Sequence, residues 1–250
     1  MEADSTGPGE AVTVAVLVPV YNERATVLDV VRKLAGELGN LKASGHIWVI
    51  NDGSTDWDDD IADALKASGP VSVVTRPVNA GKGAVLGWAF RHVEARYMVI
   101  IDADGEYLPS EIPAVLNPLL NQEADWVMGA RYGFGRPRPR QYMATYWVNR
   151  LLSAWFNLLA GRRLTADLLT GLYACRAECV RNVVLQEHRF AYTPELMWNV
   201  LRGARPRWLE VPVTYRFRSY AEGKTIRWWE TFTIFAATLR YRFVRVKGAP

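Results

Sequence analysis

The chain has 250 residues, half of them hydrophobic, and its formal net charge is +4. This composition is ample for a sizeable core and indicates a globular protein. The sequence contains no uninterrupted apolar run of about 18 residues, which argues against a membrane-spanning helix.

The start of the chain and its cysteines argue against a secreted protein. Residues 1–10 include acidic residues and no apolar segment, so we expect a short disordered leader and not a signal peptide. Cys175 and Cys179 are not spaced as a Cys-x-x-Cys pair and suggest no disulfide framework. We therefore expect a reducing compartment, the cytoplasm.

Charge is divided unevenly along the chain. Residues 1–130 carry 9 Lys and Arg against 19 Asp and Glu, whereas residues 131–250 carry 21 against 7. The halves therefore have net charges of −10 and +14. This division predicts an acidic half that binds metal and a basic half that meets phosphate or an anionic surface, although basic residues also serve solubility alone.

Apolar runs alternate with amphipathic helical patterns through the first half of the chain. The first run is stopped by Pro19, and each run is followed by a polar turn and a helical pattern. Expected strands are residues 12–18, 46–50, 71–74 and 98–101, and expected helices are residues 22–38, 61–65 and 84–93. This alternation predicts a mostly parallel sheet with helices on both faces.

The second half continues the pattern with less regular spacing. Expected strands are residues 126–128, 172–175 and 208–213, and expected helices are residues 147–159, 194–202 and 228–243. No internal repeat or low-complexity linker is visible. We therefore divide the chain into the leader (1–10), one domain (11–227) and a C-terminal amphipathic helix with its tail (228–250).

Acidic side chains follow the apolar run at 98–101 directly. Asp102 and Asp104 are separated by Ala103, and Glu106 lies two residues further on. Carboxylates this close repel one another unless a cation lies between them, and oxygen ligands suit Mg²⁺ or Mn²⁺. Since ligands of open α/β sheets bind beyond the carboxyl ends of strands, the motif predicts a divalent metal that carries a phosphorylated substrate. An isolated Asp-x-Asp would more often be a solvated acidic turn.

Three further polar motifs follow expected strands, so all four can meet in one crevice. They are Val18-Pro19-Val20-Tyr21-Asn22-Glu23, Asn51-Asp52-Gly53-Ser54-Thr55-Asp56 and Asn79-Ala80-Gly81-Lys82-Gly83. Two later motifs are Gly129-Ala130-Arg131-Tyr132 and Arg218-Ser219-Tyr220-Ala221-Glu222-Gly223-Lys224. In this ordered set of motifs, residues 12–227 resemble glycosyltransferase family 2, and within it the polyprenyl-phosphate sugar synthases. The resemblance implies an α/β protein with the GT-A fold, a mixed, mostly parallel sheet flanked by helices.

The resemblance also implies which residues bind a nucleotide sugar. Pro19, Tyr21 and Glu23 would line the nucleotide pocket. Asp52 would accept hydrogen bonds from the base, a role that suits an ionised carboxylate, and Ile50 would pack nearby.

The same resemblance places the donor diphosphate beside the acidic motif. Lys82 lies in a glycine turn whose backbone amides and ammonium group can meet phosphate. Asp102, Ala103 and Asp104 would hold the diphosphate through the metal, with Glu106 as a further metal ligand. The implied cofactor is Mg²⁺ or Mn²⁺.

Cationic residues of the basic half match family positions that meet the donor and acceptor phosphates. These residues are Arg131, Arg218 and Lys224. A guanidinium suits this role because its planar fork holds two phosphate oxygens at once. Asp104, Arg131 and Arg218 are therefore the expected catalytic residues.

The implied reaction moves a hexose from GDP-mannose or a UDP-sugar to a polyprenyl or dolichyl phosphate. The acceptor oxygen would attack the anomeric carbon in line and invert it, while the metal and the cationic side chains stabilise the departing nucleoside diphosphate. A phosphate monoester has its second pKa near about 6, so this acceptor needs positioning more than a general base.

Two alternatives remain open at this point. A family relative can instead glycosylate a hydroxyl of a cell-surface glycan or small metabolite, with Glu106 or Asp167 as base. The basic, aromatic half also suits nucleic-acid binding. However, no recognised nucleic-acid motif is present and the acidic crevice repels a polyanion, so we expect no nucleic-acid partner.

The last expected helix suggests how the protein reaches a lipid. Six apolar residues recur there at helical spacing: Trp228, Phe232, Phe235, Ala236, Leu239 and Phe243. Such a helix lies on an anionic membrane surface, or it packs on the protein's own core. We expect peripheral contact with the cytoplasmic face of a membrane, and the helix at 147–159 is the second candidate for this contact.

Overall fold

The structure is a computed structural model that describes residues 14–41, 43–132, 143–218 and 230–244. The predicted leader and Lys224 lie outside these residues. In chain order the elements are β1 (Val14–Val20), α1 (Arg24–Gly39), β2 (Gly45–Asp52), α2 (Asp59–Lys66), β3 (Val71–Arg76), α3 (Lys82–His92), β4 (Tyr97–Ile100), η1 (Pro109–Glu111), α4 (Ile112–Leu120), β5 (Trp126–Ala130), α5 (Met143–Ala160), β6 (Tyr173–Arg176), η3 (Ala177–Cys179), α6 (Tyr192–Gly203), β7 (Trp208–Pro212) and α7 (Glu230–Phe243).

The described strands form one sheet of seven strands in the order β3-β2-β1-β4-β6-β5-β7. β6 pairs antiparallel with both β4 and β5, whereas every other pairing between the described strands is parallel. The prediction of a mixed, mostly parallel sheet is therefore confirmed. Because the parallel strands point the same way, the loops that follow them meet at one edge of the sheet.

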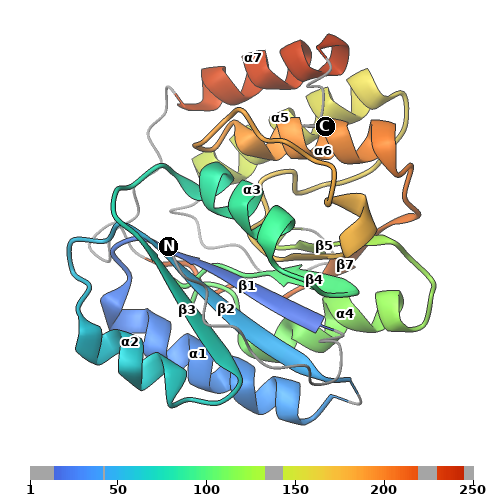
Figure 1. Ribbon diagram of the computed structural model, residues 1–250. Coiled ribbons are helices and arrows are strands. Elements are labelled where there is room, and N and C mark those ends of the chain that lie inside the picture. Colours follow the sequence, from blue (N-terminus) through green and yellow to red (C-terminus); the bar gives the residue numbers. More distant parts are fainter. Residues whose placement is uncertain (1–13, 42, 133–142, 219–229, 245–250) are drawn as a thin grey trace.

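Helices cover both faces of the sheet, as Figure 1 shows. α1, α2 and α4 pack on one face, and α3, α5, α6 and α7 pack on the other. Alternate residues of β1 serve the two faces, since Leu17 packs with α3 while Val16 packs with α1. The sheet is thus buried on both sides, which explains its continuous apolar runs.

Several strands end later than the sequence predicted, among them β1 and β2. β1 continues through Pro19 to Val20, because its pairing with β4 ends at Leu17 and Ile100 and leaves the proline with a strand partner on the β2 side alone. A proline at such a position removes no hydrogen bond of the sheet. β2 extends to Asp52 because it is paired there with β3.

The C-terminal helix packs on the core, mainly through residues other than those that the sequence singled out. α7 buries Ile234, Ala237 and Tyr241 among residues of α5 and α6. Phe232 and Phe243, by contrast, are 67% and 75% exposed. The core alternative is thus confirmed for one stripe of the helix. Of the predicted stripe, Phe232, Leu239 and Phe243 stay on the surface, and Trp228 lies outside the described residues.

Exposed apolar side chains also cover the neighbouring helix α5. We call the two stripes together the outer apolar face, which comprises Trp147, Leu151 and Leu158 of α5 with Phe232, Leu239 and Phe243 of α7. The half-buried rings of Trp155 and Phe235 lie 6.4 Å apart between these stripes. The outer apolar face therefore extends across both helices.

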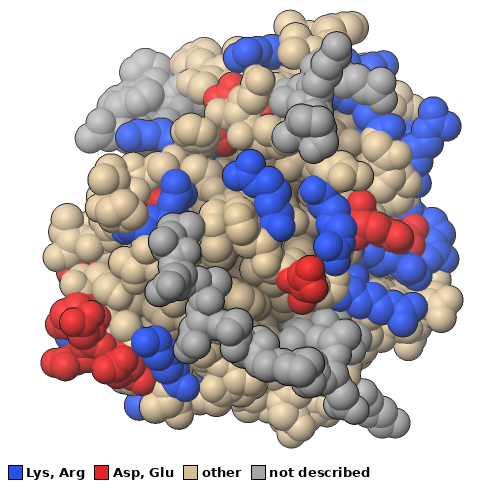
Figure 2. Space-filling model, in the orientation of Figure 1, with Lys and Arg blue, Asp and Glu red and all other residues tan. Residues whose placement is uncertain are grey.

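Charge follows the division that the sequence predicted. Figure 2 shows acidic side chains gathered at lower left, over α2, and basic side chains spread over the upper and right parts of the same face. None of the helices within the described ranges is long and apolar enough to cross a membrane.

Candidate active site

The first two loops at the carboxyl edge of the sheet are tied together by Asn22. Its backbone N–H donates to Ser54 Oγ at 2.9 Å, and its side-chain Oδ1 accepts from the Thr55 N–H at 2.9 Å. Asn22 has φ of 55°, in the left-handed region where asparagine is tolerated. Gly53 has φ of 68°, and a Cβ there would overlap the backbone at Asn79. This glycine therefore lets the loop after β3 pack against the loop after β2.

Asp52 holds the glycine turn in place. Its buried carboxylate accepts from the N–H groups of Ala80 at 3.1 Å and Gly81 at 2.6 Å, and Arg76 Nη1 lies 3.3 Å away. The sequence missed this role. Ile50, expected near the nucleotide, is fully buried in the core.

Three backbone amides of the glycine turn are used within the chain and are therefore not free to meet phosphate. Besides the two amides held by Asp52, the Gly83 N–H donates to the carbonyl of His188 at 2.8 Å. A Cβ on Gly81 or Gly83 would overlap the carbonyl oxygens at positions 187 and 188. These glycines therefore allow a close backbone approach.

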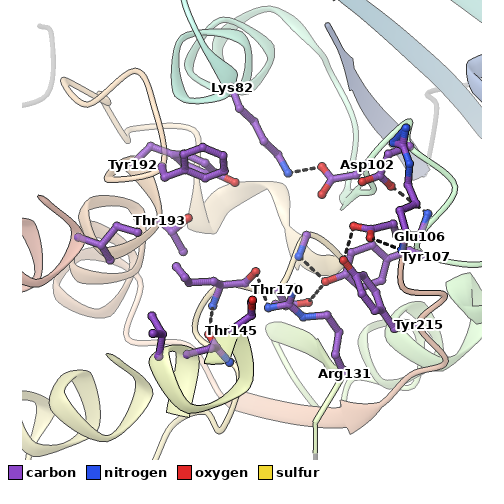
Figure 3. A pocket seen from close by; sticks show the side chains of 18 of the residues that line it. Lys82, Asp102, Glu106, Tyr107, Arg131, Thr145, Thr170, Tyr192, Thr193 and Tyr215 are labelled. Carbon is purple, nitrogen blue, oxygen red and sulfur yellow. Dashed lines mark hydrogen bonds and ion pairs between the residues drawn. The ribbon is translucent and has the colours of Figure 1, made fainter. Parts of the chain in front are cut away.

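Lys82 reaches from the start of α3 to Asp102, with which it forms an ion pair (Figure 3). Burial alone would lower the pKa of Lys82, but the negative charges of Asp102 and Asp104 outweigh burial and raise it. Lys82 is therefore firmly protonated. The ion pair is only partly shielded, with side chains 24% and 29% exposed.

Gly171 packs directly against Asp102 from the turn before β6. A Cβ at this glycine would overlap Asp102 Oδ2. The Gly171 N–H donates to the Tyr107 hydroxyl at 2.7 Å, and Thr170 Oγ1 lies 3.2 Å from the same hydroxyl. The antiparallel strand β6 thus brings a turn from the basic half onto the acidic motif.

Asp104 and Glu106 have different surroundings. Asp104 accepts the Glu106 N–H at 2.9 Å, and burial together with the charges of Asp102 and Glu106 raises its pKa to about 8. Both oxygens of Glu106 are engaged, one by the Tyr215 hydroxyl and the other by the Arg218 N–H at 2.9 Å. Glu106 therefore anchors the segment at 215–218, which sequence reasoning did not anticipate.

Arg218 pairs with Glu23 across the site. Its guanidinium donates to both carboxylate oxygens at 2.9 Å, and the two side chains are 21% and 24% exposed. Burial raises the pKa of Glu23, while the charge of Arg218 opposes that rise. A residue near the start of the domain is thereby joined to one near its end.

Arg131 is held far more tightly. Asp167, which is fully buried, accepts from Arg131 Nε at 2.9 Å and Nη2 at 2.7 Å. Asn149 of α5 donates to the same carboxylate at 2.9 Å. The guanidinium also lies 5.0 Å and 5.2 Å from the rings of Tyr132 and Tyr215. Arg131 is therefore a fixed positive charge in the wall of the site.

Two connected pockets open around these side chains. The outer pocket has a volume of about 620 Å³ and is lined by Pro19, Val20, Tyr21, Glu23, Asp52, Asn79, Gly81, Lys82, Val85, Asp102, Ala103, Asp104, Arg189, Phe190 and Tyr192. The inner pocket, of about 220 Å³, shares six of these residues and adds Glu106, Tyr107, Arg131, Thr145, Val148, Asn149, Leu169, Thr170, Gly171, Thr193, Tyr215, Arg218, Thr231 and Ile234.

The predicted residues divide between these pockets. The outer pocket collects those from the first half of the chain except Ile50 and Glu106, and Glu106, Arg131 and Arg218 line the inner pocket. Sequence reasoning missed Phe190 and Tyr192, which line both pockets. The start of the amphipathic helix at 192 was the available signal, but nothing local shows that it faces the acidic motif.

Comparison with known proteins identifies the family. The family described as glycosyl transferase family 2 matches residues 15–179, more than half of the chain. The chain therefore belongs to glycosyl transferase family 2.

Curated relatives are similar over most of this chain. Dolichol-phosphate mannosyltransferase of Pyrococcus furiosus is 27% identical over 217 residues, which cover 84% of this chain and 58% of that protein. Polyprenol monophosphomannose synthase of Mycolicibacterium smegmatis is 27% identical over 246 residues, which cover 93% of this chain and 89% of that protein. The chain thus spans less than two thirds of the first relative and most of the second.

Solved structures support the fold. Glucosyl-3-phosphoglycerate synthase from Mycobacterium tuberculosis, in complex with Mn²⁺, uridine diphosphate and phosphoglyceric acid, has a TM-score of 0.69 at 20% identity. The match covers 94% of this chain and 80% of that one. The protein has the GT-A fold of these glycosyltransferases.

The contact between Gly171 and Asp102 generates a first prediction. Gly171→Ala should displace the Asp102 carboxylate and weaken the binding of GDP or UDP with Mn²⁺ at least tenfold, or by about 1.4 kcal/mol. Calorimetric titration measures this change. Gly203→Ala is the matched control, because a Cβ there meets nothing within 4 Å. Unchanged affinity in Gly171→Ala would show that the Asp102 position is unimportant for binding.

Proposed function

We propose that this protein transfers a hexose from a nucleotide diphosphate sugar to a polyprenyl phosphate and inverts the anomeric carbon. Its membership of glycosyl transferase family 2 and its similarity to the two mannosyl-transferring relatives support this proposal. The nucleotide lies in the outer pocket against Pro19, Tyr21 and Asp52. The sugar lies where the two pockets join, and the acceptor phosphate enters from the inner pocket.

The acidic motif fits a divalent cation. With no metal ion bound, burial and the charges of Asp102 and Glu106 raise the pKa of Asp104 to about 8, and a bound divalent cation would favour its ionised form. Among the described residues no three His, Cys, Asp or Glu side chains are grouped to hold a metal. Asp102 and Asp104 would therefore hold Mg²⁺ or Mn²⁺ together with oxygens of the donor diphosphate, as is usual for Mg²⁺. The bound cation supplies positive charge to the departing diphosphate.

Lys82 and Arg218 bind the donor phosphates. Both cations are paired with partly exposed carboxylates, Asp102 and Glu23, so an incoming diphosphate competes for them at the pocket surface. Arg131 stays on Asp167 and adds its fixed charge in the inner pocket. Cations fixed near the place where negative charge develops stabilise the transition state without reorganisation.

The choice of acceptor rests on one observation: both carboxylates considered as general bases, Asp167 and Glu106, are already hydrogen-bonded within the protein. Asp167 is fully buried and bound by Arg131 and Asn149, and Glu106 is bound by Tyr215 and Arg218. Neither is placed to take a proton from a hydroxyl acceptor. This arrangement favours an acceptor that is already anionic, such as a lipid monophosphate.

The outer apolar face supports a lipid acceptor. It lies on α5 and α7, whose inward residues Val148 and Ile234 line the inner pocket. We propose that this face rests on an anionic membrane surface at the cytoplasmic side, which brings the acceptor phosphate to the pocket without a spanning helix.

A product assay with a metal-site variant tests the proposed reaction. Wild-type protein with Mg²⁺ or Mn²⁺, polyprenyl phosphate and a panel of GDP- and UDP-sugars should yield a glycosyl phosphate lipid, detected by mass. Asp104→Asn should remove most of this activity and keep the fold, and a chelator should do the same to wild type. Full turnover in excess chelator would exclude the role of the metal. Sugar transfer to phosphoglycerate and not to the lipid would contradict the proposed acceptor.

The second test of function concerns the two arginines of the inner pocket. Arg218→Ala should lower turnover by about one to two decades, because a charge-assisted phosphate contact contributes roughly 1.5 to 3 kcal/mol. Arg131→Ala should also lower turnover, because it removes the fixed charge of the inner pocket, and should lower the melting temperature, because it leaves Asp167 buried without its partner. Arg32→Ala, on the exposed side of α1, is the control and should keep wild-type turnover. Equal, small effects on turnover at all three positions would show that neither Arg131 nor Arg218 contributes to the reaction.

A further inference from the structure

A third hollow lies outside the active site, beside the end of α5. Its volume is about 630 Å³, and its lining residues are Arg150, Ser153, Ala154, Asn157, Leu158, Gly161, Arg162, Arg163, Thr165 and Ala166. We call it the basic hollow, because three of these residues are arginines and none is acidic. The mechanism above uses none of them.

The turn that carries two of these arginines is held in one conformation. Asn157 donates to the carbonyl of Thr165 at 2.7 Å, and its Oδ1 accepts from the N–H groups of Leu164 and Thr165 at 2.8 Å and 3.2 Å. Gly161 turns the chain out of α5 with φ of 69°. Arg162 and Arg163 therefore project from a backbone that is already fixed.

The three arginines carry charge that no carboxylate of the described residues neutralises. Within the described residues, Arg150, Arg162 and Arg163 form no ion pair, whereas Arg131, Arg207 and Arg218 each bind a carboxylate. The nearby carboxylate of Glu210 accepts from Thr165 Oγ1 at 2.6 Å and from the Ala166 N–H at 2.7 Å. A cluster of unneutralised guanidinium groups favours an anionic partner with several oxygens.

The basic hollow borders the outer apolar face. In a helix of 3.6 residues per turn, Arg150 lies about 60° around α5 from Trp147, and Trp155 lies about 80° away in the other direction, toward α7. Leu158, which is 70% exposed, belongs to both the hollow and the apolar face. Apolar side chains and unpaired arginines thus share one edge of the molecule, as they do on surfaces that meet anionic lipid.

We infer that the basic hollow binds the phosphate of an anionic lipid headgroup while the adjoining apolar face enters the acyl region. The lipid is a second ligand and not the acceptor, because the hollow lies on the outer side of α5 and shares no lining residue with the inner pocket. The inference rests on the proposed membrane contact. It specifies how the enzyme is oriented on the bilayer.

Sedimentation with vesicles of phosphatidylcholine, with or without phosphatidylglycerol, tests the inference on the full chain. Arg162→Gln/Arg163→Gln should lower the partition coefficient onto the anionic vesicles about 25-fold, since each basic residue near such a surface contributes about fivefold. Partition onto pure phosphatidylcholine should not change. Arg32→Gln/Lys66→Gln removes the same charge from α1 and α2 on the other side of the sheet, and should partition as wild type.

Two further variants distinguish a specific phosphate-binding site from general attraction between a basic protein and an anionic surface. Phe232→Ser/Phe243→Ser should weaken binding to both kinds of vesicle, because it removes apolar contact. Arg162→Lys/Arg163→Lys keeps the charge but not the fork, and should bind anionic vesicles more weakly than wild type.

Several results would overturn the inference. One is an equal loss of vesicle binding in the two Gln double variants, and another is wild-type binding by the Lys double variant. A third is that the wild-type protein binds no vesicles but binds a short RNA, and that Arg162→Gln/Arg163→Gln loses this RNA binding. Displacement of the protein from vesicles by low concentrations of inorganic phosphate would assign the hollow to a free anion instead. None of these measurements requires turnover, so failure of the proposed reaction is recognised separately by the product assay.

Discussion

The site depends on the pairing of carboxylates with cations at the carboxyl edge of the sheet. The acidic half contributes the carboxylates of the two partly exposed pairs, and the cations of these pairs come from the glycine turn and from the basic half. The three pairs are Asp102 with Lys82, Glu23 with Arg218 and Asp167 with Arg131. Each pair joins different segments of the chain, and the pair of Glu23 with Arg218 joins the acidic half to the basic half across one crevice.

Burial separates the pairs into two kinds. Asp167 is fully buried and the Arg131 side chain is 10% exposed, so breaking this pair would leave an unpaired buried charge at high cost. The pairs of Lys82 and Arg218 are about a quarter exposed on each side, where exchange with phosphate oxygens costs less. The same kind of contact therefore serves as a fixed wall in one place and as an exchangeable phosphate site in another.

Much of the fold was predictable because its signals are local. Apolar runs mark β1, β2, β3 and β4, and the polar motifs that follow them lie at one edge because parallel strands share a direction. The assignment of Asp102, Asp104 and Lys82 to one place followed from this rule and from the family resemblance. The end of β1 was misjudged because Pro19 is tolerated only through the absence of a β4 partner there, which the sequence of β1 does not reveal.

The remaining features depend on contacts between residues far apart in the chain. Gly171 touches Asp102 only because β6 runs antiparallel between β4 and β5, and no pattern in residues 172–175 specifies that direction. The helical pattern of α7 was recognised, but which stripe faces inward is decided by the shapes of α5 and α6. Likewise Asp52 and Glu106 hold backbone groups, and those partners are set by loop conformation.

The position of Mn²⁺ in a crystal of the protein with a nucleoside diphosphate, located by anomalous scattering, tests the pairing of carboxylates and cations most directly. We predict a single peak between Asp102, Asp104 and the diphosphate, with Lys82 and Arg218 turned from their carboxylates to phosphate oxygens and Arg131 still bound to Asp167. A diphosphate bound without Mn²⁺ at these carboxylates, with the Lys82 and Arg218 ion pairs intact, would contradict the account.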